Sequence, residues 1–184
     1  MSALEQEIFW SPAVAPSVLT LVHPPDFLPV RSHQPLTELG TARHSPEGTH
    51  AISVGDVGTQ VVLLPGSDPS QPLAALIPLD SDTLGRVEAL TRFWRSRHGR
   101  KVPADTRMTI QQRRRLRLKL QAADGRMNGA SYREIAIAIF GKERLASEPW
   151  KTSPLRDTII GLVEEGFALI DGGYLKLLRH RRRS

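Results

Sequence analysis

Through the first hundred residues, short apolar runs alternate with turn-forming residues, a pattern typical of short strands. Residues 50–54 and 59–64 are two such runs, and the Gly-Asp-Val-Gly segment between them predicts a hairpin. Residues 1–45 are rich in proline around a short apolar run at 18–22, which indicates isolated strands and loops. A further strand is expected at 73–79, so this part of the chain is predicted to form a small sheet.

A helix is expected after this sheet, because the apolar spacing lengthens to three or four residues. Asp80, Ser81 or Asp82 can cap its start, and Gly99 ends it after about Arg97. The apolar positions at helical spacing are Leu84, Val87, Leu90 (or Ala89) and Trp94.

Helical spacing continues beyond a polar linker at 100–108. Thr109 can cap a helix that runs to about Ala123, where Asp124-Gly125 stops it. Its expected apolar face comprises Ile110, Leu116, Leu120 and Ala123, and its other positions hold Arg113, Arg114, Arg115, Arg117 and Lys119.

A second helix start is marked by Ser131-Tyr132-Arg133-Glu134, which is a capping box: each end residue's side chain can accept from the other's backbone N–H. The helix is expected to reach Phe140, although alternating isoleucines leave a strand as the rival. The positions on its inward face are Tyr132, Ile135, Ala136 and Ile139, and Gly141 suits its C-terminal cap.

Ser153-Pro154 marks a third start, since proline at the first helical position loses no hydrogen bond. This helix is expected to reach about Ile170, where Gly172-Gly173 breaks it, and a short helix follows at 174–180. Its expected inward positions are Leu155, Ile159, Leu162, Val163 and Ile170. The predicted fold class is therefore α+β, with a small N-terminal sheet and one helix followed by a helical bundle.

Charge divides the chain unevenly. Residues 1–100 carry 7 Lys/Arg and 10 Asp/Glu, a net −3, whereas residues 101–184 carry 18 and 9, a net +9. A basic half beside an acidic half suggests that one half meets a polyanion and the other does something else. We therefore expect two domains, a β-rich region at 1–100 and a basic helical region at 101–184.

The sequence lacks the residues that several kinds of chemistry require. The chain has no cysteine, which excludes disulfides and thiolate sites, and its six histidines show no metal-ligand spacing. The glycines at 55–58 lack the Lys-Ser/Thr of a phosphate-binding loop, and Glu164-Glu165 lies on an amphipathic helix. We therefore expect no enzyme, metal or cofactor. With no basic leader and no long apolar run, the protein is expected to be cytoplasmic and not membrane-bound.

The two capped starts, 131–134 and 153–157, lie close together in the most basic part of the chain. They predict an atypical helix-turn-helix that docks on double-stranded DNA. Helix N-termini bind phosphate, and Arg156 carries a donor pair that suits guanine. The motif is atypical because residues 142–152 separate its helices, whereas the usual turn has about 3–4 residues. A longer loop or an extra helical turn must intervene.

The candidate DNA-binding residues are Arg113, Arg114, Arg117, Ser131, Arg133, Lys151, Thr152, Ser153, Arg156, Lys176, Arg181, Arg182 and Arg183. Simpler interpretations stay open for some of them. The arginines from 113 onward are also compatible with a solvated helix face, Arg133 with an ordinary surface residue, and Arg156 with an ion pair to Asp157 or Glu134. Trp150 and Tyr132 are assigned to packing rather than to base stacking.

The same segments resemble a bacterial family of helix-turn-helix transcription regulators that was first catalogued as a domain of unknown function. The family includes the DNA-binding domain of a type VI secretion transcription regulator. It also includes the activators and antiactivators that control excision of integrative and conjugative elements in rhizobia. The residues that carry the resemblance, over roughly 75–180, are Gly125-Arg126, Gly129–Ala136, Phe140-Gly141, Trp150-Lys151, Ser153–Asp157 and Gly172–Leu178.

The resemblance implies a helical DNA-binding domain with a role in transcription, and it implies that some members bind another member rather than DNA. Our first hypothesis is a sequence-specific regulator of mobile-element or secretion genes, acting as a homo-oligomer. Its first half would serve oligomerisation or contact with RNA polymerase or another partner. The alternative is an antiactivator or co-regulator that binds a related regulator protein. A third hypothesis is an accessory protein of recombination that bends DNA.

Overall fold

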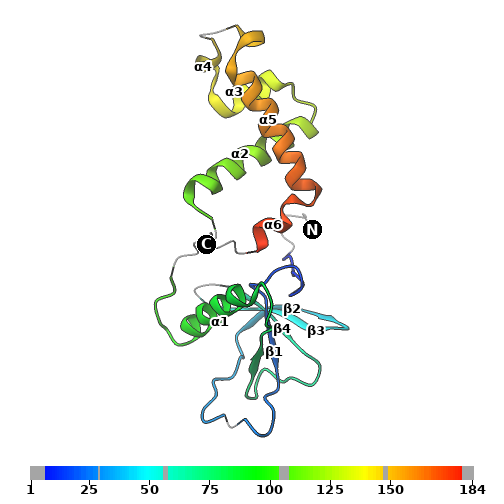
Figure 1. Ribbon diagram of the computed structural model, residues 1–184, viewed down its shortest axis with the longest axis vertical. Helices are drawn as coiled ribbons and strands as arrows, with labels where there is room; N and C mark the ends of the chain where they lie inside the picture. The colour runs from blue at the N-terminus through cyan, green and yellow to red at the C-terminus, as the bar shows by residue number, and fades with distance from the viewer. Residues whose placement is uncertain (1–6, 29, 56–57, 104–107, 147–148, 180–184) are drawn as a thin grey trace. The chain divides into compact units, whose positions relative to one another are not determined.

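The computed structural model describes residues 7–28, 30–55, 58–103, 108–146 and 149–179, and Figure 1 shows their elements. The chain divides into two compact units, one formed from Met1–Ala104 with Leu178–Ser184 and the other from Asp105–Leu177. A five-stranded sheet precedes the helices α2 to α6, and helix α1 follows the sheet in the first unit. The α+β class predicted from the sequence is therefore confirmed.

The sheet of the first unit has the strand order β2-β3-β4-β1-β5. Its strands are β1 (Leu19–Val22), β2 (Leu39–Ser45), β3 (Gly48–Ser53), β4 (Thr59–Leu63) and β5 (Ala74–Leu76). β1 runs parallel to β4, and the other neighbouring strands are antiparallel. The hairpin predicted over 50–64 is confirmed as β3 and β4, and the strand expected at 73–79 is the shorter edge strand β5.

Strand β2 lies where the sequence predicts only isolated strands and loops. Its residues, Leu-Gly-Thr-Ala-Arg-His-Ser, are mostly exposed, so no alternation of apolar and polar positions marks them. The strand is held instead by antiparallel pairing with β3 across the turn at Pro46-Glu47. Edge strands of this polar kind are identified by their neighbour rather than by their own composition.

The central strands bury both of their faces. Successive residues of a strand point to opposite sides of the sheet, so each strand contributes to two apolar clusters. One face, with Leu21, Val61 and Leu63, packs against helix α1 (Thr83–Arg97), which lies across the sheet in Figure 1. The other face presents Val62 to a smaller cluster.

Helix α1 has the predicted bounds, but only part of its predicted apolar set packs on the sheet. Ala89, Leu90 and Phe93 contact the core, whereas Leu84 and Trp94 are 67% and 46% exposed. Helical spacing identifies two apolar stripes on α1. Which stripe faces the sheet is decided by the packing and not by the spacing.

The second unit contains α2 (Ile110–Met127), α3 (Tyr132–Phe140), α4 (Lys142–Ala146), η2 (Trp150–Thr152), α5 (Pro154–Ala168), η3 (Leu169–Gly173) and α6, whose bounds are Leu175–Leu178. Helices α2, α3 and α5 share one core, formed by Ala122, Ile135, Ala136, Ile159, Leu162 and Val163. The segment at 132–140 is therefore a helix, and its strand rival is excluded. Of the two alternatives expected between 142 and 152, a longer loop or an extra helical turn, the structure shows helical turns, α4 and η2.

Three expectations for α2 were wrong. The helix continues past Asp124-Gly125 to Met127, and the chain reverses at Gly129, whose φ of 84° favours glycine. Ile110 and Leu120 are exposed rather than inward. The inward face of α2 is set by α5, which approaches α2 closely and therefore contacts it through small residues such as Ala123. The approach is so close that a Cβ on Gly166 would lie 2.4 Å from the backbone oxygen of Lys119.

The end of α5 also differs from its prediction. Ile159, Leu162 and Val163 are buried as expected, but Ile170 is exposed because α5 ends at Ala168 and η3 turns the chain away. Gly172, with φ of 89°, breaks the helix as predicted. The last helix is shorter than the predicted 174–180, and His180 lies outside the described residues. Of the helices among the described residues, none combines the length and the apolar character that a membrane span requires.

Candidate nucleic-acid interface

The start of α2 is held by reciprocal hydrogen bonds. Thr109 Oγ1 accepts from the backbone N–H of Gln112 at 3.1 Å, and Gln112 Oε1 accepts from the N–H of Thr109 at 2.8 Å. This capping box satisfies two backbone donors that a helix start leaves without partners. It fixes the first turn of α2, and the arginines begin directly after it.

The cations of α2 fall into two groups. Arg115 and Lys119 lie 3.0 Å and 2.9 Å from the carboxylate of Glu165 on α5. The hydrogen bond from Lys119, more than any other contact, lowers the pKa of Glu165. Arg114 and Arg117 are exposed, and within the described residues no carboxylate pairs with either. Their charge is therefore available to an external anion.

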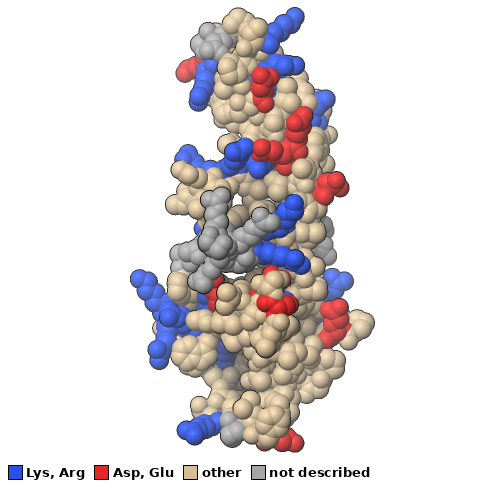
Figure 2. Space-filling view, in the orientation of Figure 1, with Lys and Arg blue, Asp and Glu red and all other residues tan. Residues whose placement is uncertain are grey.

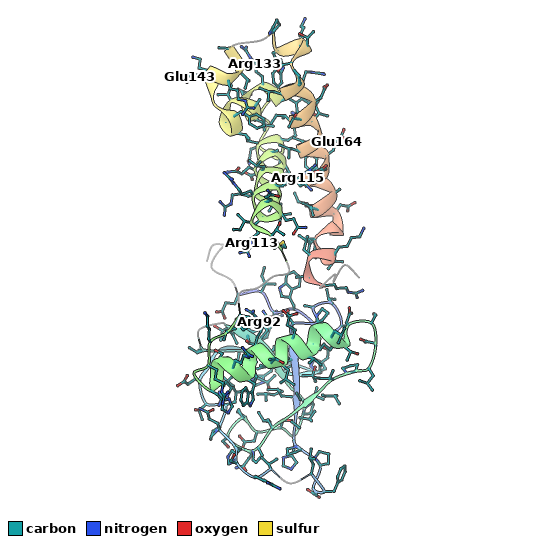
Figure 3. The ribbon with its side chains drawn as sticks, turned by 60° about the vertical axis from the view of Figure 1, so that its left-hand side comes forward. Arg92, Arg113, Arg115, Arg133, Glu143 and Glu164 are labelled. Atoms are coloured by element: carbon teal, nitrogen blue, oxygen red, sulfur yellow. The ribbon has the colours of Figure 1, made fainter. Side chains whose placement is uncertain are left out.

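Arg113 behaves differently from its neighbours. It donates from Nη2 to the carbonyl of Met108 at 3.3 Å, so its guanidinium folds back over the start of the helix. Figure 3 shows it at the beginning of α2, with Arg115 further along the same helix. Its side chain is exposed.

The turn between α2 and α3 is short and internally bonded. The N–H of Ala130 donates to the carbonyl of Gly125 at 3.0 Å, and Arg126 Nη1 donates to the carbonyl of Ala130 at 3.2 Å. The Arg126 guanidinium also lies 5.2 Å from the ring centroid of Tyr132. Arg126 thus holds the turn that orients α3. Sequence reasoning gave it no such role, because the contact depends on the path of the turn.

The predicted cap of α3 is confirmed. Glu134 Oε2 accepts from the backbone N–H of Ser131 at 2.8 Å, and Ser131 Oγ accepts from the N–H of Glu134 at 3.3 Å. The hydrogen bond from the Ser131 backbone is the main reason that the pKa of Glu134 is lowered. The Ser131 hydroxyl is therefore engaged in the cap, while Arg133 is exposed on the first turn (Figure 3).

The cap of α5 is confirmed as well. Ser153 Oγ accepts from the N–H of Leu155 at 3.2 Å, and Pro154 occupies the first turn. Ser153 is only 6% exposed, and Thr152 Oγ1 donates to the carbonyl of Pro149 at 3.3 Å. These two hydroxyls shape the helix start, whereas Lys151 beside them is exposed.

Arg156 lies on the first turn of α5 beside an acidic neighbour. Its Nη1 is 3.7 Å from Asp157 Oδ1, and both side chains are exposed, 45% and 82%. The simpler interpretation, an ion pair with Asp157, is thus observed at long range. Exposed pairs of this kind contribute about 0–1 kcal/mol, so the pair leaves the guanidinium able to exchange partners.

The structure places the candidate residues of this unit in two groups rather than one. Arg156 precedes Glu165, the partner of Arg115, by nine residues of α5, which corresponds to roughly 14 Å along a helix. Lys151 directly precedes the first turn of α5, and Arg133 lies on the first turn of α3. Arg113, Arg114 and Arg117 lie on the first half of α2. This separation is similar to the width of the DNA major groove, about 12 Å. Lys176 is exposed on α6, and Arg181–Arg183 lie outside the described residues.

Comparison with known families gives this arrangement its context. Residues 76–179 match the family described as the T6SS transcription factor, DNA binding domain. The match covers more than half of the chain. The protein belongs to this family. It is thus a DNA-binding protein of the transcription-factor type, and the resemblance to a type VI secretion regulator is confirmed. A search of curated proteins found no match.

The T6SS-type domain of this chain includes α1 as well as the helices of the second unit, since the match begins within β5. The expected boundary at residue 100 therefore falls inside the region that defines the family.

Helix α5 of the T6SS-type domain carries little positive charge. Arg156 is its one basic residue, while Asp157 and Glu164 are exposed. Figure 2 shows acidic side chains along this helix. The later part of α5 is therefore unfavourable for phosphate contact, and its first turn holds a single cation, Arg156, beside Asp157.

The segment between α3 and α5 packs on the common core. Phe140, Leu145 and Trp150 are half-buried against it, as is Tyr132. Trp150 therefore serves packing, as expected. Sequence reasoning missed Lys142 and Arg144, which α4 exposes beside the end of α3. The sequence signal that could have identified them was the pair of cations itself, in a segment that was expected to be only a loop or a turn.

Proposed function

We propose that this protein is a transcription regulator that recognises a specific DNA sequence with an atypical helix-turn-helix made of α3 and α5. The observation that carries the proposal is the single core shared by α2, α3 and α5, on which two capped helices, α3 and α5, pack together. Helices packed in this way can place the first turn of the last helix against base edges. The insertion of α4 and η2 makes the turn longer than usual.

Each candidate residue has a distinct task in this proposal. Arg156 contacts a base edge, and Arg133 and Lys151 bind phosphates beside it. Ser131 and Ser153 act through their caps, which aim backbone N–H groups at the DNA backbone, and Thr152 acts through its hydrogen bond to Pro149 before α5. The residues assigned to phosphates further away are Arg113, Arg114, Arg117, Lys176 and the tail Arg181, Arg182 and Arg183.

We further propose that the target genes are secretion or mobile-element genes, and that the protein acts as a homo-oligomer. One short helix buries too little surface for operator affinity, so a second copy or a second surface is needed. Residues 1–100 are the part available for oligomerisation or for contact with RNA polymerase or another regulator.

The test is binding of the purified protein to duplex DNA from the flanks of its own gene, against a scrambled duplex, at two salt concentrations. A preference that persists at the higher salt supports the proposal. Equal binding to both duplexes that disappears with salt would mean a non-specific basic protein, because the electrostatic part of the affinity falls steeply with ionic strength.

Arg156→Ala tests the assignment of the base contact. We expect a loss of about 1–3 kcal/mol on the preferred duplex and a relaxed preference at one base pair. Arg43→Ala, which removes an exposed arginine from strand β2, is the control and leaves binding unchanged. A loss that is equal for all sequences would make Arg156 a backbone contact only.

The acidic surface of α5 favours a second candidate function. Asp157 and Glu164 repel phosphate but suit a basic protein surface, as expected of an antiactivator that binds a related regulator. In that case the complex with the partner protein forms without DNA. Alanine at both positions would weaken this complex, whereas it would strengthen DNA binding under the first proposal.

A further inference from the structure

A second group of cations lies at the end of α1, in the unit that was not expected to bind DNA. Arg92, Arg95, Arg97, Arg100 and Lys101 fall within ten residues that contain no Asp or Glu. We call these five residues the α1-end cluster. Figure 2 shows Lys and Arg side chains gathered where α1 ends. The cluster stands out because residues 1–100 as a whole carry a net −3.

Main-chain carbonyls, and not carboxylates, are the partners of this cluster. Arg97 Nη2 donates to the carbonyls of Gln34 and Pro35 at 3.0 Å and 2.7 Å, and Arg92 donates to the carbonyl of Pro103. Arg95 Nη1 donates to the carbonyl of Lys101 at 3.3 Å. Across the described residues, no carboxylate forms an ion pair with an arginine of the cluster. Within the part of the chain that the structure describes, its positive charge is therefore not neutralised by a carboxylate.

The helix dipole explains only part of this charge. A cation in the last turn of a helix is favourable, which accounts for Arg95 and Arg97. Arg100 and Lys101 lie beyond the helix end at His98, and both are exposed. Two exposed cations that satisfy no helix terminus, and that pair with no carboxylate among the described residues, point to an anion from outside the chain.

An aromatic stack holds Arg100 in place. The rings of Trp94 and His98 lie 4.2 Å apart with an interplanar angle of 24°, and the Arg100 guanidinium lies 5.1 Å from the Trp94 ring. Gly99, with φ of 58°, turns the chain so that the N–H of Arg100 bonds the carbonyl of Arg95 at 2.8 Å. Because the Trp94 ring already carries two contacts, it is poorly suited to stack an unpaired base. The arrangement favours phosphates of an intact duplex over single-stranded nucleic acid.

We propose that the α1-end cluster is a second surface for the backbone of double-stranded DNA, with Arg95, Arg100 and Lys101 as its phosphate contacts. The inference rests on the proposed function, because it assumes that the helical unit binds a duplex. The family match supports it, since the matched region starts before α1. Two surfaces on one chain that bind the same duplex give a higher overall affinity than either surface alone. The reason is that binding of the first surface raises the effective concentration of the second.

The test compares two variants of the full chain that lose the same charge. Arg95→Gln with Arg100→Gln removes two cations from the cluster, and Arg31→Gln with Arg43→Gln removes two exposed cations from elsewhere in the same unit. Binding to a preferred and to a scrambled duplex is measured over a range of salt concentrations, and the melting temperature of each variant is recorded.

We expect the cluster variant to bind both duplexes more weakly, by roughly tenfold for each lost contact at about 0.1 M salt. The slope of log K against log salt should fall by about 0.9 for each contact. The control variant should match the wild type, and Arg95→Lys with Arg100→Lys should keep most of the slope.

An unchanged slope in a cluster variant that melts like the wild type would overturn this inference and leave the proposed function intact. An equal loss in both variants would overturn it too, because net charge alone would then explain the effect. If the wild type binds neither duplex, the proposed function itself fails. If the glutamine variant unfolds, the lysine variant is used instead. It keeps both positive charges, so a lower salt slope in this variant would contradict phosphate contacts that depend on charge.

Discussion

Helices α2 and α5 pack against each other along the same core, yet they present opposite charge to solvent. The first half of α2 exposes Arg114 and Arg117, which no described carboxylate neutralises. Helix α5 exposes Asp157 and Glu164 and has a single basic residue, Arg156. Under the proposed function, most of the electrostatic attraction to DNA therefore comes from α2, while α5 contributes Arg156 alone.

Under the proposed function, this difference assigns most of the affinity for DNA to α2 and the selection of the sequence to α5. Phosphate contacts position a protein on DNA, and contacts with base edges select the sequence. Under the proposed function, the acidic side chains of α5 weaken non-specific attraction, so a duplex whose base edges fit Arg156 gains relative to one that does not. Glu165 also reduces the number of α2 cations that can contact phosphates, because it forms ion pairs with Arg115 and Lys119.

The different charges of α2 and α5 are held side by side by the close packing of the two helices. The substitution Gly166→Ala should disrupt this packing. A Cβ at this position would lie 2.4 Å from the Lys119 oxygen and 2.8 Å from the Ala123 Cβ, so the helices must separate. We expect the unfolding free energy to fall by about 2–3 kcal/mol in denaturant titrations.

Gly161→Ala is the matched control, because it lies in the same helix and nothing lies within 4 Å of its new Cβ. It should stabilise the protein by up to about 1 kcal/mol, since alanine favours the helix. Similar losses for both variants would mean that the close approach does not govern stability.

The charge difference within α2 is tested by two double variants that each remove two cations. Arg114→Gln with Arg117→Gln should lower the affinity for any duplex by about tenfold or more per contact at 0.1 M salt, with a lower salt slope. Arg115→Gln with Lys119→Gln removes cations that Glu165 already holds in ion pairs, so the slope should fall less than in the first variant. Equal changes would show that net charge alone sets the affinity.

The cap of α3 makes a smaller contribution. Ser131→Ala removes the hydroxyl that accepts from Glu134, and we expect the unfolding free energy to fall by about 1 kcal/mol. Ser32→Ala, at an exposed position without helical structure, should change it by less than about 0.5 kcal/mol. If the Ser131 variant were as stable as the Ser32 variant, the capping box would be unimportant for the fold.

The smallest expected effect is a dependence on pH through Glu134. Its pKa in the folded protein lies below the ordinary value of 4.5, so the charged form stabilises the fold at higher pH. That stability is present above the unfolded pKa and is lost as the pH falls through the folded pKa. The melting temperatures of the wild type and of Glu134→Gln should therefore converge on acidification, and a constant difference would contradict this cause.

The sequence by itself determined the local features of the helical unit. Ser131 and Ser153 cap the helices they were expected to cap, because a capping box and a serine before proline act over three or four residues. The hairpin of β3 and β4 was predicted for the same reason, since its turn lies between its strands. The family resemblance likewise depended on short motifs in order.

Only the tertiary structure decided how distant segments meet. The parallel pairing of β1 with β4, the polar strand β2 and the stripe of α1 that faces the sheet depend on partners far away in the chain. The same holds for Glu165, which forms ion pairs with Arg115 and Lys119 but with neither Arg114 nor Arg117. Local sequence sets backbone preference and spacing, whereas burial and ion pairing depend on close packing of residues that the sequence separates.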